Sequence, residues 1–484
     1  MSRRADDTPR SPRRGRSRIA PALLAGWGAG LALALAVAAR PVPGQQAPAP
    51  RELERELVAA ATAGDAAAAE QAARALLAAE PARLERLLAR HREPAVRWVA
   101  LEALLGAAAG AAGPPAAAPQ GEAAARAANA IRTALADRDE RLVLRAARAA
   151  RVHRAPELLA PLVEALGRAE RVPAEQSWLA SEITAILQEL TGQQLGQAAA
   201  WRAWLRRHGT EPPPLLPPPP DAPAGAGGSG ADEPELAGSA AATIPRRLAR
   251  RPGAQQLLER LSARDLVVVR GKYDQAEEVL AELGLPFTPV ERPRLGEAAL
   301  DGEQVLIFNC SDVEEEPTPA AGIQRVRQAA EAGAWLLSSD WEAANLIARA
   351  FPGHIQLGPR TRGDQRLVIA PAPGMALHPL MRDVFPISPL QLARWRWRID
   401  DDTWTVIPTR QSLVLLTCPE LEAQTGHGTV ALSFPVGRRG GRVLHVLSHY
   451  TDESAGPEGG YVLQQLIVNF VLEKQRLRAA AGTR

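Results

Sequence analysis

Three residues in the second half of the chain are of types that together perform nucleophilic chemistry: Cys310, Ser339 and His449. A thiol or hydroxyl becomes a nucleophile when an adjacent imidazole takes its proton, and a carboxylate beyond the imidazole orients the ring. Asp452 or Glu453, shortly after the histidine, could supply that carboxylate. One hypothesis is therefore a hydrolase or amidase that uses Cys310 or Ser339 with His449 as the base.

The same part of the chain could instead form a ligand pocket. Each of the three residues lies at the end of an apolar run typical of a buried strand, namely 304–311, 334–339 and 441–450. The carboxyl ends of parallel strands meet at one edge of a sheet, where α/β proteins bind ligands. The side chains expected at that edge are those of Cys310, Ser339, Asp340, Trp341 and His449.

Each candidate also has a purely structural interpretation. Cys310 is typical of a small buried core thiol. Ser338, Ser339 and Asp340 precede a predicted helix, and their side-chain oxygens could cap its first backbone N–H groups. Trp341 could pack against the sheet or stack on a sugar or a peptide aromatic ring.

Two further tryptophans leave an alternative open. Trp395 and Trp397 share one face of a predicted strand, and Arg396 and Arg398 share the other. That tryptophan face is either buried or exposed at a sheet edge. If it is exposed, the two tryptophans together with Trp341 could bind carbohydrate.

No metal or cofactor site is expected. The acidic segments 312–317 and 398–404 could offer carboxylates to a hard cation, but they lack the EF-hand spacing and are interpreted as solvated loops. His378 precedes Pro379 in a predicted turn and has no cluster of other histidines around it. Cys310 and Cys418 could form a disulfide only if the fold brought them together.

Strands and helices alternate from residue 244 to residue 478, which predicts an α/β domain with a mainly parallel sheet. Further β segments after residue 390 predict added antiparallel strands. The predicted strands are 265–271, 287–290, 304–311, 334–339, 393–399, 403–407, 412–418, 429–436 and 441–450, and the predicted helices are 273–284, 321–333, 340–351 and 461–477.

Residues 51–209 contain almost no strand signal, and their apolar residues recur at helical spacing. They predict an all-α domain built as a stack of short helices. Trp201 and Trp204, three positions apart, are expected to be core aromatics that close one end of that stack.

The remaining segments suggest an exported protein of two tethered domains. Residues 210–243 are rich in Pro, Gly and Ser and predict a linker. Residues 1–44 combine an arginine-rich start with an apolar stretch at 19–39, which predicts a signal peptide or, if uncleaved, an N-terminal membrane anchor. Eight arginines against Asp6 and Asp7 give this segment a charge of +6, which leaves −3 for the rest and argues against a nucleic-acid partner.

Two parts of the chain resemble known families. The stretches "EPAVRWVALEALL" (93–105) and "DERLVLRAARAARVHRAPELLAPLVEAL" (139–166) resemble HEAT-type repeats, which implies a partner-binding surface. The α/β region resembles the class I glutamine amidotransferase-like superfamily, which implies a flavodoxin-like sheet. In that family an oxyanion loop, a Gly-x-Cys-x-Gly nucleophile elbow and a His followed by an acid correspond to the places occupied here by "LIFNCSD" (306–312), "LLSSDWE" (336–342) and "LSHYTDE" (447–453).

The elbow departs from the family pattern. Its central residue needs small neighbours two positions away on each side, because the backbone there is strained. With Ser339 at the centre those neighbours are Leu337 and Trp341, and with Asp340 they are Ser338 and Glu342. No cysteine stands at this turn.

The sequence therefore favours an exported bacterial binding or scaffold protein over an enzyme. Its helical repeats would bind a protein partner, and its degenerate amidotransferase-like domain would bind a small molecule or glycan. The expected location is the periplasm, with any membrane contact restricted to residues 19–39. The envelope hydrolase using Cys310 or Ser339 with His449 is the alternative.

Overall fold

The computed structural model describes residues 48–111, 121–208, 215–217, 240–251, 253–390, 395–450 and 456–482. The predicted signal or anchor segment, most of the predicted linker, and the acid candidates Asp452 and Glu453 lie outside these ranges. In the part of the chain that the structure describes, no helix is long and apolar enough to cross a membrane.

The described residues between 50 and 208 fold as successive helices, which confirms the prediction of a helical N-terminal region. The side chain of Asp65 caps one helix by accepting from the Ala68 N–H, and that of Asp139 caps another by accepting from the Arg141 N–H. The helices are α2 (Pro50–Ala63), α3 (Ala66–Ala79), α4 (Pro81–Arg90), α5 (Pro94–Ala111), α6 (Glu122–Leu135), α7 (Glu140–His153), η1 (Pro156–Leu158), α8 (Leu159–Ala169), α9 (Leu179–Thr191) and α10 (Ala198–His208).

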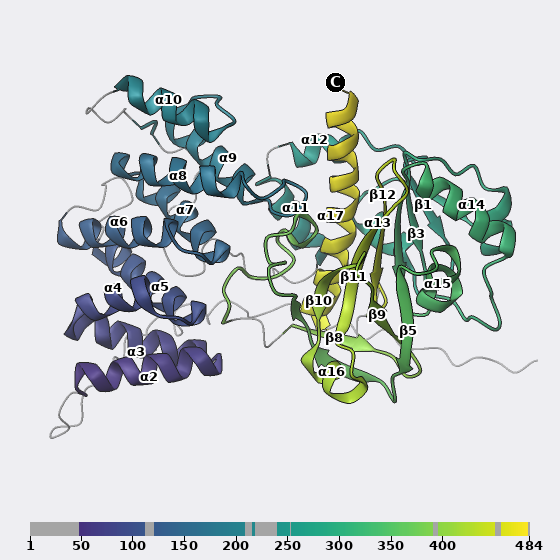
Figure 1. Ribbon diagram of the computed structural model, residues 1–484, viewed down its shortest axis with the longest axis horizontal. Coiled ribbons are helices and arrows are strands. Elements are labelled where there is room, and N and C mark those ends of the chain that lie inside the picture. The colour runs from purple at the N-terminus through teal and green to yellow at the C-terminus, as the bar shows by residue number, and fades with distance from the viewer. Residues whose placement is uncertain are drawn as a thin grey trace, which may run out of the picture. The chain divides into compact units, whose positions relative to one another are not determined.

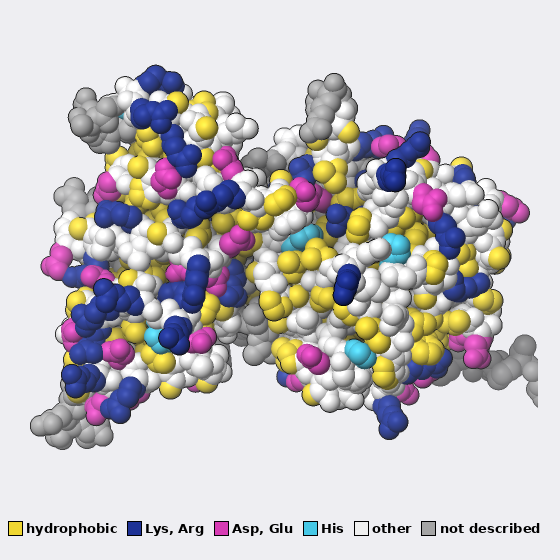
Figure 2. All heavy atoms as spheres, in the orientation of Figure 1, with side chains coloured by type: hydrophobic (Ala, Val, Ile, Leu, Met, Phe, Trp, Pro, Cys, Tyr) yellow, Lys and Arg dark blue, Asp and Glu magenta, His cyan; other side chains and the backbone are white. Residues whose placement is uncertain are grey.

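Apolar residues from all of these α-helices form one core. Trp201 and Trp204 on α10 belong to it, with their rings edge to face at 5.7 Å, as predicted for core aromatics. Ion pairs add links between helices, such as Arg145 on α7 with Glu102 on α5 at 2.5 Å. Figure 2 shows basic and acidic side chains interspersed on the visible face of these helices.

The C-terminal region contains an eight-stranded sheet with the order β2-β1-β3-β4-β12-β11-β10-β7. The first five strands in this order are parallel and the last three are antiparallel to their neighbours, which confirms a mainly parallel sheet with added antiparallel strands. The strands are β1 (Leu266–Val269), β2 (Thr288–Val290), β3 (Val305–Phe308), β4 (Trp335–Ser339), β7 (Ala370–Pro371), β10 (Leu413–Thr417), β11 (Thr429–Val436) and β12 (Gly441–Val446).

The five parallel strands have the chain order 2-1-3-4-5, which is the order of flavodoxin-like doubly wound sheets. In such sheets the ligand crevice lies at the carboxyl ends of the strands, next to the point where the strand order reverses. Here the reversal falls between β1 and β3. The loops that follow β1, β3, β4 and β12 are therefore the ones that position a site.

Helices cover both faces of the sheet, and every residue of β1, β3 and β4 is buried. In Figure 1, α14 and α15 lie on one side and the long α17 on the other. The Trp335 ring of β4 packs on Phe470 of α17 at 4.8 Å. The helices are α11 (Ala240–Leu248), which begins within the segment predicted as linker, α12 (Ala254–Glu259), α13 (Ala276–Glu282), η2 (Arg292–Glu297), α14 (Ala320–Glu331), η3 (Ala343–Ile347), α15 (Ala348–Ala350), η4 (Pro379–Met381), α16 (Pro419–Thr425) and α17 (Gly456–Gly482).

Two antiparallel strand pairs form separate two-stranded sheets that are not hydrogen-bonded to the large sheet. Strand β8 (Arg396–Ile399) pairs with β6 (Gln365–Val368), and β9 (Trp404–Pro408) pairs with β5 (Ile355–Arg360). Trp395 and Trp397 are buried in the core whereas Arg396 is exposed, so the tryptophan face is the buried one of the two alternatives. These two side chains are therefore not placed to stack on a carbohydrate.

Candidate functional site

The chain turns sharply after β4, and Asp340 is the residue at the turn. Its φ of +41° lies in the left-handed region, which Asp adopts more readily than most residues because its short side chain bonds locally. The Asp340 N–H donates to the carbonyl of Val446 at the end of β12, at 2.8 Å. The residue with positive φ at this turn therefore carries a carboxylate, not a thiol or a hydroxyl.

The prediction that Ser338, Ser339 and Asp340 cap the helix they precede is wrong. The helical segment begins only at Ala343, and no side chain makes a cap hydrogen bond there. The hydroxyl of Ser339 donates instead to Asp274 Oδ2 at 2.8 Å, and the hydroxyl of Ser338 lies 3.0 Å from Nδ1 of His445. These are the last two residues of β4, and their hydroxyls bond to His445 of β12 and to Asp274 after β1, not to N–H groups at the helix start.

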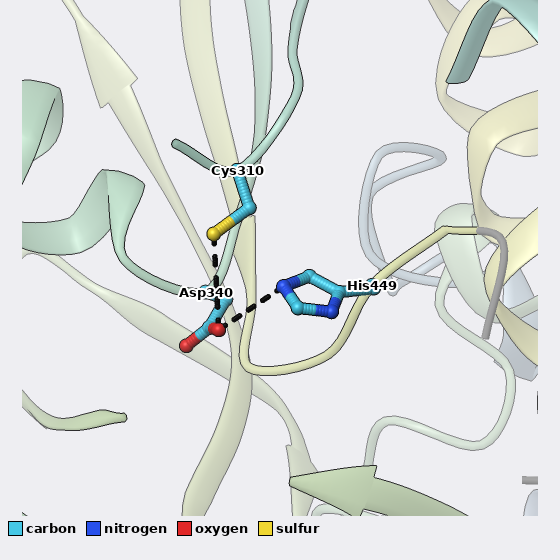
Figure 3. A group of neighbouring side chains, drawn as sticks. All are labelled: Cys310, Asp340 and His449. Carbon is cyan, nitrogen blue, oxygen red and sulfur yellow. Dashed lines mark hydrogen bonds and ion pairs between the residues drawn. The ribbon is translucent and has the colours of Figure 1, made fainter. Parts of the chain in front are cut away.

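Three of the five predicted site residues meet in one cluster (Figure 3). Oδ2 of Asp340 lies 3.8 Å from Sγ of Cys310 and 3.2 Å from Nε2 of His449. One sulfur, one carboxylate oxygen and one ring nitrogen from these residues all lie within 4.8 Å of one another. They follow β3, β4 and β12, so the convergence expected from the parallel strands occurs.

Two carboxylates that the sequence reasoning missed complete the site, and the first is Asp274, which follows β1. It accepts from the hydroxyl of Ser339 and from the backbone N–H groups of Tyr450 and Gln275, at 2.8, 2.8 and 3.0 Å. The signal for Asp274 was its place after a buried strand, the same signal that identified the other candidates.

The second is Asp400, which corrects the interpretation of 398–404 as a solvated loop. Its Oδ2 lies 3.4 Å from Nδ1 of His449, on the side of the ring opposite Asp340. Asp401 and Asp402 are exposed as expected, whereas Asp400 is half-buried. A run of three aspartates gives no indication of which one points inward.

Burial and charge set the protonation of the cluster. Burial, together with the negative charge of Asp340, raises the pKa of the Cys310 thiol well above its usual range. Burial alone would lower the pKa of His449, but the carboxylates of Asp340, Asp274 and Asp400 raise it to about 9. The neutral thiol and the protonated imidazole are opposite to what a nucleophile and its general base need.

A buried ion pair holds the segment that follows the turn. A guanidinium nitrogen of Arg292 lies 3.0 Å from Glu342, and the same side chain donates to Thr318 Oγ1 and to the Asn309 carbonyl. Burial raises the pKa of Glu342 to about 7, although Arg292 opposes that rise. Glu342 stands two residues after Asp340, so this pair anchors the segment that carries the Asp340 carboxylate.

The remaining candidates lie at the edge of the site or elsewhere. Trp341 is half-buried and packs edge to face against Tyr273 at 5.5 Å. Cys418 is a free thiol whose Sγ accepts from the Leu421 N–H at the start of α16, and Cys310 is free as well. Nδ1 of His378 accepts from the backbone at the start of η4.

No family model and no curated protein matches this chain. Among solved structures, a match is found to the exo-β-1,4-mannosidase Op5Man5 from Opitutaceae bacterium strain TAV5, with 13% identity and a TM-score of 0.27. The match covers 45% of this chain and 36% of the mannosidase chain. A similarity of this size supports no inference about function.

Proposed function

We propose that the α/β region is a non-catalytic ligand-binding domain, tied to a helical region that binds a protein partner. The observation that carries this proposal is the residue at the turn after β4, where Asp340 takes the position that a nucleophilic thiol or hydroxyl would occupy. The HEAT-like and amidotransferase-like assignments, the exported location and the partner are parts of the same proposal.

The contacts of the two possible nucleophiles support binding over catalysis. The Ser339 hydroxyl donates its proton to Asp274 and not to His449. The Cys310 thiol is buried and protonated, and its contact is with Asp340. A buried cluster of polar groups that makes no nucleophile-to-base hydrogen bond is suited to holding a ligand.

Hydrolysis is the second candidate, and one distance favours it. Sγ of Cys310 lies within 4.8 Å of a ring nitrogen of His449, so a modest movement would bring thiol and imidazole into contact. In that alternative Asp400 would orient the ring through Nδ1.

Turnover assays separate the two candidates. The full chain is assayed against glutamine, amide, ester and peptidoglycan substrates beside His449→Ala and Ser339→Ala. We expect no turnover from the folded wild-type protein. Turnover that His449→Ala abolishes would overturn the binding proposal in favour of the hydrolase.

Thiol alkylation provides an independent measurement. Cys310 and Cys418 are both buried with raised pKa values. We therefore expect iodoacetamide to react slowly with the native chain, and to alkylate both thiols readily once the chain is unfolded. A nucleophilic Cys310 would instead be alkylated quickly in the native protein, and Cys310→Ala would remove that fast phase.

A further inference from the structure

The cluster of Cys310, Asp340 and His449 brings together three different donor atoms that metals bind. They are a thiol sulfur, a carboxylate oxygen and an imidazole nitrogen, presented by the loops after β3, β4 and β12 (Figure 3). We infer that these three side chains bind one Zn²⁺-type transition metal ion and leave its fourth position for a donor group of the ligand. This inference rests on the proposed binding function, which it makes more specific.

The distances between the donor atoms fit tetrahedral coordination. Zinc bonds of about 2.0 Å to oxygen and nitrogen and about 2.3 Å to sulfur place neighbouring donor atoms about 3.3 to 3.6 Å apart. Here the nitrogen to oxygen distance is 3.2 Å and the sulfur to oxygen distance is 3.8 Å. All three donor atoms lie within 4.8 Å of one another, so small side-chain movements suffice to surround an ion.

Two buried donor groups in the cluster lack hydrogen bonds, which is the second observation that points to a ligand. Asp340 is only 3% exposed, yet its Oδ1 has no hydrogen-bond partner among the described residues. Nε2 of His449 also has no hydrogen-bond partner there, although it lies 3.2 Å from Asp340 Oδ2 in an ion pair. Buried polar atoms are nearly always satisfied in folded proteins, and a cation bound by Nε2 and by the Asp340 carboxylate would compensate both groups.

The outer contacts match those of known metal sites. A metal-bound histidine usually directs its second ring nitrogen to a carboxylate, which fixes the ring orientation. Asp400 occupies that position, with Oδ2 3.4 Å from Nδ1 of His449. The Asp340 backbone is held by its bond to the Val446 carbonyl, so the carboxylate is aimed before any ion binds.

The local charge and the donor set select the kind of cation. Asp274, Asp340 and Asp400 act on the imidazole of His449, and Arg398 pairs with Asp400. Mixed sulfur, nitrogen and oxygen donors suit Zn²⁺ or Co²⁺, whereas Ca²⁺ and Mg²⁺ prefer sites built from oxygen alone.

Cobalt provides a direct spectroscopic test. The untagged full chain is freed of metal with a chelator and titrated with Co²⁺, and then with Zn²⁺ as competitor. We expect one equivalent to bind, with a thiolate-to-cobalt charge-transfer band in the near ultraviolet that Zn²⁺ abolishes. Cys310→Ala should lose the band, and Asp400→Asn should keep it while binding about 10- to 100-fold more weakly.

Cys418→Ala is the matched control, because it removes the other buried thiol outside the cluster. A band that survives in Cys310→Ala, or disappears in a folded Cys418→Ala, would place the metal elsewhere and overturn the inference. The absence of any cobalt band from the folded wild-type chain would overturn it as well. The turnover assays test the proposed function separately. A chain that binds no metal and turns over no substrate would overturn the metal inference alone. A chain that binds metal and hydrolyses a substrate would overturn the non-catalytic proposal alone.

Discussion

The carboxylate of Asp340 lies between the two other members of the cluster, with a single oxygen 3.2 Å from Nε2 of His449 and 3.8 Å from Sγ of Cys310. The imidazole therefore contacts this carboxylate where a catalytic pair would require it to contact the thiol. Asp340 is also the residue with positive φ at the turn. A substitution there changes both the backbone geometry and the charge, so separate variants are needed to measure the two effects.

The backbone effect can be measured by comparing Asp340→Gly with Asp340→Ala. Both variants remove the carboxylate, but only glycine adopts a φ of +41° without a steric cost. We expect the glycine variant to be the more stable by about 1 kcal/mol in urea unfolding. Equal stabilities would show that the turn relaxes and that its geometry is not held by the fold.

The buried pair of Arg292 and Glu342 should be far more sensitive than a surface pair. Arg292→Ala leaves Glu342 buried without its partner, and we expect the free energy of unfolding to fall by about 3 to 5 kcal/mol. The double variant Arg292→Met with Glu342→Leu should lose less than this single variant, because it leaves no buried charge.

An exposed pair serves as the control for that comparison. Arg74→Ala breaks the surface contact with Glu70 and should change the stability by under about 1 kcal/mol. If Arg292→Ala were as mild as Arg74→Ala, the buried pair would not anchor the turn.

Two glycines should respond to alanine in opposite directions. A Cβ on Gly271 would lie 2.4 Å from the Cys310 carbonyl oxygen, so Gly271→Ala must displace the Cys310 loop and should cost about 1 to 3 kcal/mol. Gly106 lies in α5 with nothing within 4 Å of such a Cβ, so Gly106→Ala should stabilise the chain by up to about 1 kcal/mol. Thermal or urea unfolding of both variants measures this, and a tolerated Gly271→Ala would show that the two loops are not tightly packed.

Stability should decrease in acid through the buried His445. Burial lowers its folded-state pKa from 6.5 to about 4, so the unfolded chain binds the proton first as the pH falls. The contribution of His445 to the free energy of unfolding is at its full value above pH 6.5. It falls by up to about 3 kcal/mol as the pH decreases from 6.5 to 4.

The difference between wild type and His445→Gln isolates that effect. Asp274 acts in the opposite direction, because burial raises its pKa to about 6 and the folded state takes up that proton first. We expect the stability difference to be constant above pH 6.5 and to shift in favour of the variant toward pH 4. A difference that does not depend on pH would show that His445 titrates normally.

His378, whose pKa burial also lowers to about 4, provides a second test of the same kind.

The sequence by itself determined the helical first region and the parallel sheet of the second, because apolar periodicity and continuous apolar runs depend on local residue order. The run 429–436 matches β11 residue for residue. Strands β5 and β6 were missed because their residues are half polar and they are stabilised by partners 28 to 53 positions later, which no local pattern records.

The sequence also determined that Cys310, Asp340 and His449 would meet, since each follows a strand of one parallel sheet and such strands end at one edge. Tertiary structure alone decided what they do there. In the folded chain Asp340, and not Ser339, has the left-handed backbone conformation at the turn. The Ser339 hydroxyl donates to Asp274, and of the three consecutive aspartates Asp400 is the one that faces the imidazole of His449. These outcomes depend on distances of a few ångströms between loops far apart in the chain, and such distances follow from packing, not from the local order of residues.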